Sequence, residues 1–249
     1  MYYAHTIYTW AHENKPKGYK YPEYKQLWMT GVGAATFMCM KEMIGLIMTP
    51  LYKWMMPMKD DEAVWLKKIE KCVNSTNGLV YFIISTYWGY HTLHNSTWLP
   101  WYLGGQNPKA SLEYTFQTLF METPPGTHCY VLMTYGYHVQ DFFHHVFFSA
   151  RDNDWREMLL HHIAALALYP GFMFGGILSG GVVAAWLHDV ADIAVNACRL
   201  SNTLGFKLPT TILYINMVVV WGYTRLMVLP FFIYSCLGLM RFPQHVSHF

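Results

Sequence analysis

The chain has 249 residues, of which 53% are hydrophobic and only 13% are charged. Because soluble domains carry roughly 25% charged residues, this composition excludes an ordinary soluble domain and argues against disorder. The net charge of +2 is too small to indicate nucleic acid as a partner. Mean hydropathy is only +0.14, because 19 Tyr, 10 Trp and 13 His count as polar, yet these side chains tolerate membrane interfaces and buried polar sites.

Six stretches approach the length of about 20 mostly apolar residues that a membrane-spanning helix needs. In chain order they cover about residues 27–56, 77–93, 130–149, 155–174, 181–198 and 209–239. Lys41, Glu42 and Pro50 interrupt the first stretch, which is therefore either one long tilted helix or an interfacial piece followed by a span. The expected fold is an all-α polytopic membrane bundle of about six transmembrane helices. It occupies residues 27–240, between a polar N-terminal segment (1–26) and a short C-terminal tail (241–249).

Three connections between the expected spans have a recognisable character. A charged amphipathic link at 59–72 precedes the second span, and a surface helix is expected near 110–122 after it. The loop between them contains Trp98, Trp101 and Tyr102, which suit the headgroup belt of a membrane. A glycine-rich connection at 171–181 is expected to turn the chain between the fourth and fifth spans.

Ionisable side chains concentrate in the third, fourth and fifth expected spans, where each costs several kcal/mol and usually marks a functional path. The third span carries His138, Asp141 and His145 on one helical stripe; the fourth carries His161 and His162; and the fifth carries His188, Asp189 and Asp192. Counting about eight residues from each set to the glycine-rich turn puts the last two sets about 12 Å from the same end of an antiparallel hairpin. We therefore expect these two sets to face each other at one depth.

Three interpretations of this concentration of polar groups are open. It is a polar network that fixes helix packing, a catalytic or ligand pocket, or a diiron or zinc centre. The number of ionisable groups favours the pocket, and the absence of HxxHH and HxxxH boxes disfavours the metal centre, so no metal ligand is assigned. An imidazole beside a carboxylate suits acyl transfer. Since no GxSxG elbow supplies a serine, a histidine is either the acyl acceptor or the base for the substrate's own amine or hydroxyl.

The sequence resembles the TLC-domain family, and in particular the Lag motif of ceramide synthases. The resemblance lies in RDNDWREMLLHHIAALALYP (151–170) and LHDVADIAVNACRL (187–200), which leave 25 residues between His162 and His188. The later stretch YTRLMVLPFFIYS (223–235) resembles the last helix of that family. The segment GYHVQD (136–141) resembles instead the GYxxxD pattern of smaller, lipid-handling TLC-domain proteins. The resemblance is firm over about 128–236 and looser over 60–127.

The resemblance implies a helical membrane bundle whose cavity takes a long-chain acyl-CoA and a sphingoid base and forms an amide. It implies that His161 and His162 are the catalytic pair and that Asp189 and Asp192 support them. The remaining polar residues of the bundle are then candidate substrate contacts: His138, Asp141, His145, His188 and Arg225. Acyl-CoA would act as a co-substrate, and no tightly bound cofactor is expected.

Two functional alternatives follow. The first is an acyl-CoA-dependent N-acyltransferase in the endoplasmic reticulum membrane, the location that the resemblance implies. The second is a non-catalytic TLC-fold protein that binds lipid or serves as an accessory subunit of a larger membrane assembly, such as a mitochondrial respiratory complex in the inner membrane. In both, the expected partners are lipids and long-chain acyl groups, and the protein is an integral membrane homodimer or a subunit of a larger complex.

Overall fold

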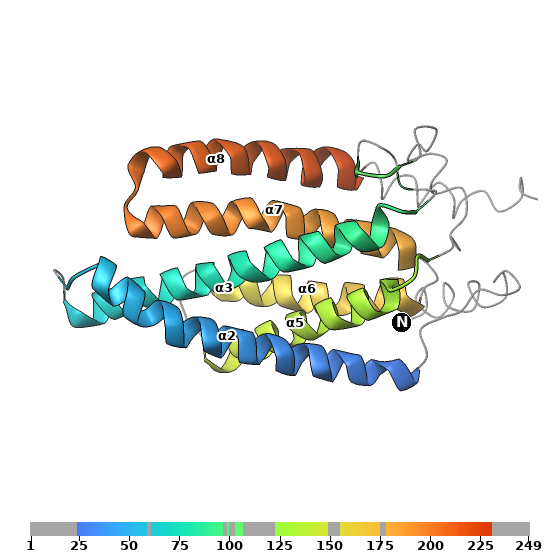
Figure 1. Ribbon diagram of the computed structural model, residues 1–249, viewed down its shortest axis with the longest axis horizontal. Coiled ribbons are helices and arrows are strands. Elements are labelled where there is room, and N and C mark those ends of the chain that lie inside the picture. Colours follow the sequence, from blue (N-terminus) through green and yellow to red (C-terminus); the bar gives the residue numbers. More distant parts are fainter. Residues whose placement is uncertain are drawn as a thin grey trace, which may run out of the picture. The chain divides into compact units, whose positions relative to one another are not determined.

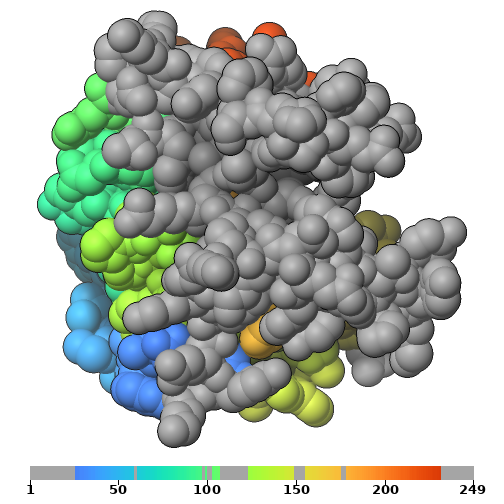
Figure 2. All heavy atoms as spheres, turned by 90° about the vertical axis from the view of Figure 1, so that its right-hand side faces the viewer, coloured from blue at the N-terminus to red at the C-terminus, as the bar shows by residue number. Residues whose placement is uncertain are grey.

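Helices account for most of the described chain (Figure 1). The computed structural model describes residues 24–58, 61–96, 99, 103–106, 123–148, 155–174 and 178–230, which are coloured in Figure 1 and Figure 2. Its elements are the 3-10 turn η1 (Tyr24–Leu27), helices α2 (Trp28–Met55), α3 (Glu62–Leu93), α5 (Thr127–Phe147), α6 (Trp155–Phe174), α7 (Leu178–Leu204) and α8 (Lys207–Trp221), and the π-helical segment η3 (Gly222–Val228). Within these ranges no strand occurs, and the expected all-α fold is confirmed.

Three helical segments are long and apolar enough to cross a membrane, by length and composition. They are α2, α7 and the continuous stretch Lys207–Val228 formed by α8 and η3. These segments coincide with the first, fifth and sixth expected spans. Helices α5 and α6 coincide with the third and fourth, and α6 has the expected bounds, Trp155–Phe174. The six long helices of the described chain thus match the six predicted spans.

The helix bounds differ from the prediction at several connections. Pro50 lies inside α2 without ending it, so the first stretch is one long helix. Helix α3 begins at Glu62, so the charged link is the first part of the second helix, because Lys and Glu are good helix formers. Helix α6 continues to Phe174 and α7 starts at Leu178, which makes the glycine-rich turn shorter than expected. The surface helix near 110–122, Trp98, Trp101, Tyr102 and the sixth span beyond residue 230 lie outside the described residues.

The described residues form two compact units. Unit 1 contains those up to Ala35, those from Trp88 to Ala185, and Pro230; unit 2 contains those at 36–87 and 186–229. Helices α2, α3 and α7 each contribute residues to both units. Unit 1 therefore holds α5 and α6, whereas unit 2 holds α8 and η3.

In unit 1, glycines allow the first turns of α2 to cross α5 at close range. A Cβ atom on Gly33 would lie 2.7 Å from the backbone oxygen of Met133, and one on Gly136 would overlap the backbone oxygen of Thr30. Small residues at such crossings let helix backbones approach closely, which is how membrane helices gain packing energy. The buried side chains of Tyr130, Val131 and Leu132 continue the core along α5.

In unit 2, the end of α2 and the start of α3 pack around a small buried cluster. Tyr52, Ile69 and Cys72 form this cluster, and Leu200 and Leu204 of α7 pack against it. The Tyr52 hydroxyl lies 2.6 Å from the hydroxyl of Thr76. These contacts bury the polar tip of Tyr52 with a partner, as a phenol inside an apolar core requires.

Helices α7 and α8 form an antiparallel hairpin in unit 2, joined by a short turn (Figure 1). Gly205 ends α7 with φ of 81°, in the left-handed region. Its N–H donates to the carbonyl of Asn202 at 3.1 Å, and the N–H of Phe206 donates to the carbonyl of Ser201 at 3.1 Å. This pair of bonds is a Schellman motif, which satisfies the last carbonyls of a helix and favours glycine at the left-handed position.

Candidate functional site

Unit 1 brings the α5 stripe against α6. The Nε2 atom of His162 lies 3.9 Å from Oδ2 of Asp141, and only 5% of the His162 side chain and 29% of the Asp141 side chain are exposed. This separation is too long for a hydrogen bond but short enough for electrostatic attraction between a buried imidazole, once protonated, and a partly exposed carboxylate. Asp141 of the α5 stripe therefore faces an ionisable residue of α6, His162.

His145 joins the same group and also ties α5 to the first residue of α6. Its ring lies 5.0 Å from that of His162 and stacks on the Trp155 indole at 5.3 Å. Nε2 lies 2.9 Å from the carbonyl oxygen of Trp155, and the Trp155 indole N–H donates to the His145 carbonyl at 3.3 Å. Because a carbonyl oxygen only accepts, Nε2 of His145 carries a proton. These bonds fix the ring orientation of His145 beside His162.

His138 is the most N-terminal residue of the stripe on α5, and aromatic rings surround it. Its ring centroid is 5.1 Å from that of Tyr169 on α6, and Tyr169 in turn stacks on Tyr135 at 5.5 Å. Tyr169 is buried. His138, Asp141 and His145 thus all face α6, which supports their prediction as members of one stripe.

The two neighbouring histidines of α6 have different surroundings. His162 is buried, whereas His161 is exposed, although their rings remain 5.7 Å apart. Successive residues on an α-helix point about 100° apart, so only one of two neighbours faces α5. The structure therefore separates the predicted pair into an inward and an outward imidazole.

Unit 2 holds the second set of predicted residues. Asp189 of α7 is buried and accepts a hydrogen bond from the Ser85 hydroxyl of α3 at 2.6 Å. Asp192 accepts a bond of 3.5 Å from the guanidinium of Arg225, which lies in the π-helical segment η3. His188 is partly buried on the same helix. Although the two aspartates share a face of α7, each has its own partner within unit 2.

A polar stripe on α3 was not predicted. Asn77, Tyr81 and Ser85 recur every four residues and are 5%, 0% and 2% exposed, so they lie on one buried face of α3. The Ser85–Asp189 bond shows that this face packs on α7, and a Cβ on Gly78 would come within 2.6 Å of Oδ1 of Asn196. Polar residues at four-residue spacing within an apolar span are the sequence signal that would have identified this stripe.

These arrangements offer proton chemistry rather than a formed metal cluster. Within the described ranges, no group of three or more His, Cys, Asp or Glu side chains is arranged to hold a metal ion. In unit 1 an imidazole, His162, lies beside a carboxylate, where it can accept a proton and where Asp141 would stabilise the resulting imidazolium. In unit 2 the Asp192–Arg225 pair balances charge inside the unit.

Comparison with known protein families identifies the family to which the chain belongs. The family model described as the TLC domain matches residues 71–246, well over half of the chain. The chain belongs to the TLC-domain family. Every candidate site residue, from His138 to Arg225, lies within the matched segment. The resemblance found in the sequence is thereby confirmed, and with it the assignment of the helices to a polytopic membrane fold.

Several curated relatives of this TLC-domain protein are ceramide synthases. It is similar to ceramide synthase hyl-2 of Caenorhabditis elegans, with 25% identity over 232 residues, 87% of this chain and 65% of the relative. It is also similar to ceramide synthase 4 of Mus musculus, with 26% identity over 75% of this chain and 44% of the relative. With ceramide synthase 1 LOH3 of Arabidopsis thaliana it shares 25% identity over 71% of this chain and 56% of the relative. The chain thus spans 44% to 65% of the length of these relatives.

Proposed function

We propose that this TLC-domain protein is an N-acyltransferase that joins the acyl group of a long-chain acyl-CoA to the amine of a sphingoid base. The observation that carries the proposal is His162, an imidazole buried beside the Asp141 carboxylate inside the family-matched segment. An ionisable pair inside a membrane bundle, here a buried imidazole and a partly exposed carboxylate, is costly and usually serves a function. The similarity to proteins named ceramide synthases supports the choice of substrates.

The reaction requires one proton acceptor near the attacking amine. As the amine nitrogen attacks the thioester carbonyl, the N–C bond forms and the C–S bond breaks, so CoA leaves as a thiolate. His162 takes the proton that the amine loses and passes it to the thiolate, which leaves as free CoA thiol. Asp141, at 3.9 Å, stabilises the imidazolium between these steps. Acyl-CoA enters as co-substrate, and the scheme uses no tightly bound cofactor.

The other predicted residues take supporting parts in this proposal. His161, Asp189 and Asp192 complete the catalytic set that the family resemblance implies, and His138, His145, His188 and Arg225 are proposed substrate contacts. The endoplasmic reticulum membrane is the proposed location, since the resemblance to ceramide synthases implies it. Sphingoid bases and long acyl chains partition into membranes, so an intramembrane site meets both substrates where they are concentrated.

The first test is N-acyl product formation by the purified chain supplied with a C16–C24 acyl-CoA and sphinganine. His162→Ala should lower the rate at least about 100-fold, because general-base catalysis contributes about 10²–10⁴-fold. His161→Ala and Asp141→Asn should also lower it. His144→Ala is the matched control, since His144 lies on α5 outside the proposed set, and it should keep the rate.

The outcomes separate the proposal from its alternative. If the folded chain forms no N-acyl product with any acyl length, the enzyme proposal is wrong, and a non-catalytic lipid-binding or accessory role takes its place. The accessory role predicts that the native chain comigrates with a large complex on a mild detergent gel. If His162→Ala is as active as His144→Ala, His162 is not the base, even if the chain is an acyltransferase.

A further inference from the structure

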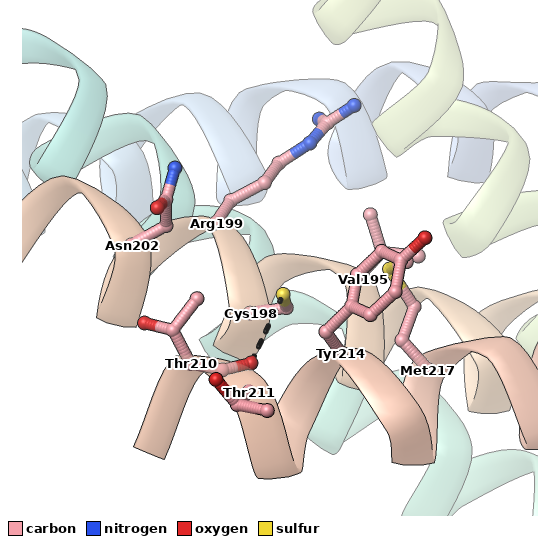
Figure 3. Close-up of a pocket in the computed structure, with 8 residues that line it drawn as sticks. All are labelled: Val195, Cys198, Arg199, Asn202, Thr210, Thr211, Tyr214 and Met217. Carbon is pink, nitrogen blue, oxygen red and sulfur yellow. Dashed lines mark hydrogen bonds between the residues drawn. The ribbon is translucent and has the colours of Figure 1, made fainter. Parts of the chain in front are cut away.

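Unit 2 contains a groove that lies between α7 and α8 and shares no residue with the proposed catalytic set. It has a volume of about 560 Å³. Figure 3 shows Thr210 and Thr211 of α8 facing Cys198 of α7 at one end, and Tyr214 and Met217 beside Val195 at the other. Both walls belong to helices that are apolar and long enough to cross a membrane. The groove is therefore a candidate site for a membrane component.

The two helices are joined at the floor of the groove, which keeps its walls in place. The Cys198 thiol donates to the Thr210 carbonyl at 4.0 Å, and the hydroxyls of Ser201 and Thr210 lie 2.9 Å apart. The Schellman motif at Gly205 fixes the turn that leads into α8. The groove is thus a feature of the hairpin itself.

Polarity changes along the groove in the same order as along a lipid molecule. At 1.5 Å per residue, Asn202, Arg199 and Thr211 lie about 3, 8 and 6 Å from the hairpin turn. Val195 and Met217 lie about 14 and 15 Å from it by the same measure. A turn between two membrane spans lies at a membrane surface, where the headgroup layer is roughly 5–8 Å thick. The polar residues are thus at headgroup depth and the apolar ones at hydrocarbon depth.

The charge at the mouth of the groove selects among lipids. Arg199 and Asn202 are exposed there. A guanidinium binds phosphate and carboxylate oxygens with two parallel hydrogen bonds, and the amide NH₂ group of Asn202 can donate to the same oxygens. We infer that the groove binds a phospholipid with an anionic headgroup. Its anionic headgroup lies against Arg199 and Asn202, and one acyl chain lies along Val195, Tyr214 and Met217.

The test measures lipid retention by the purified full chain in detergent, using native mass spectrometry with added dioleoyl phosphatidylserine or dioleoyl phosphatidylcholine. The unaltered chain should retain phosphatidylserine about fivefold more than phosphatidylcholine, because the extra carboxylate of phosphatidylserine gives its headgroup a net negative charge that Arg199 attracts, whereas the choline ammonium cancels the phosphate charge of phosphatidylcholine. Arg199→Gln should remove this preference. Lys207→Gln removes the same charge near the same depth without lining the groove and should keep it. Met217→Trp, which fills the deep part, should reduce retention of both lipids.

Two results would overturn the inference. Equal retention of the two lipids by the unaltered chain would show that the groove does not select a headgroup. Equal loss in Arg199→Gln and Lys207→Gln would show that general surface charge, rather than the groove, attracts the lipid. Thermal unfolding of each variant verifies folding, and Arg199→Gln keeps the test valid if Met217→Trp does not fold. None of these results depends on N-acyltransferase activity, so this inference and the proposed function fail separately.

Discussion

The buried carboxylate of Asp189 illustrates how single residues make ionisable groups tolerable in this bundle. Asp189 is 2% exposed, and the hydroxyl of Ser85 donates to it at 2.6 Å. A carboxylate that loses a donor in such a place keeps its desolvation cost without the compensating bond. Ser85 is therefore a positioning residue for Asp189, whatever Asp189 itself does.

Ser85→Ala should lower the free energy of unfolding by about 2 kcal/mol, the usual contribution of a hydrogen bond to a charged group. The measurement is denaturant unfolding of the purified chain in detergent. Ser75→Ala is the matched control, because Ser75 is also buried on α3 but lies about three helical turns from Ser85. It should cost less than about 1 kcal/mol. Equal losses in the two variants would mean that the Ser85–Asp189 bond contributes nothing specific.

At the scale of elements, the effect of a glycine on stability depends on whether it lies inside a helix or ends one. Gly205 has φ of 81° and ends α7, whereas Gly45 lies inside α2. A Cβ atom would meet nothing within 4 Å at either position. Any difference between substitutions at the two sites therefore reports backbone conformation rather than packing, which makes them a matched pair.

Gly205→Ala should destabilise the α7–α8 hairpin by about 1–2 kcal/mol, because an L-residue is strained in the left-handed region. Gly45→Ala should instead stabilise the chain by up to about 1 kcal/mol, since alanine loses less conformational freedom in a helix. Thermal unfolding of each variant in detergent measures both changes in stability. A stabilising Gly205→Ala would contradict the Schellman turn.

At the scale of the whole molecule, the exposed side chains of the long helices are mostly apolar. Leu46 of α2 is 77% exposed and Val219 of α8 is 64% exposed, and α8 as a whole has no buried residue. In water such surfaces would drive aggregation. In a bilayer they face acyl chains, so exposure marks contact with lipid. The first part of α3 differs, because its exposed side chains include charged ones such as Lys68.

Nitroxide labels introduced at these positions in a cysteine-free background should distinguish the two environments. In liposomes, labels replacing Leu46 and Val219 should collide more often with oxygen than with a water-soluble nickel complex, because oxygen concentrates in hydrocarbon. A label replacing Lys68 should show the reverse order. Electron paramagnetic resonance saturation measures both collision rates. Nickel access at Leu46 equal to that at Lys68 would show that α2 does not cross the bilayer there.

The helices and the family were predictable from the sequence because both depend on local features. Apolar runs of sufficient length fix which segments are helical spans, and α6 ends where its run ends. The His-His and His-Asp-Asp motifs each lie within a short stretch of sequence. They can therefore be recognised from residue spacing alone, without knowing any tertiary contact. The start of α3 was missed because charged residues form helices as readily as apolar ones, and hydropathy does not register them.

The partners of the site residues depended on contacts between helices. Sequence spacing placed His161 and His162 together, but only the packing of α6 on α5 decided that His162 faces Asp141 while His161 is exposed. Ser85 and Asp189 are 104 positions apart, and no local pattern links them. The sequence by itself therefore determined the membrane family of the chain and indicated a set of candidate site residues. The tertiary structure decided which of them touch, because the rotation of one helix against another is set by packing along its whole length.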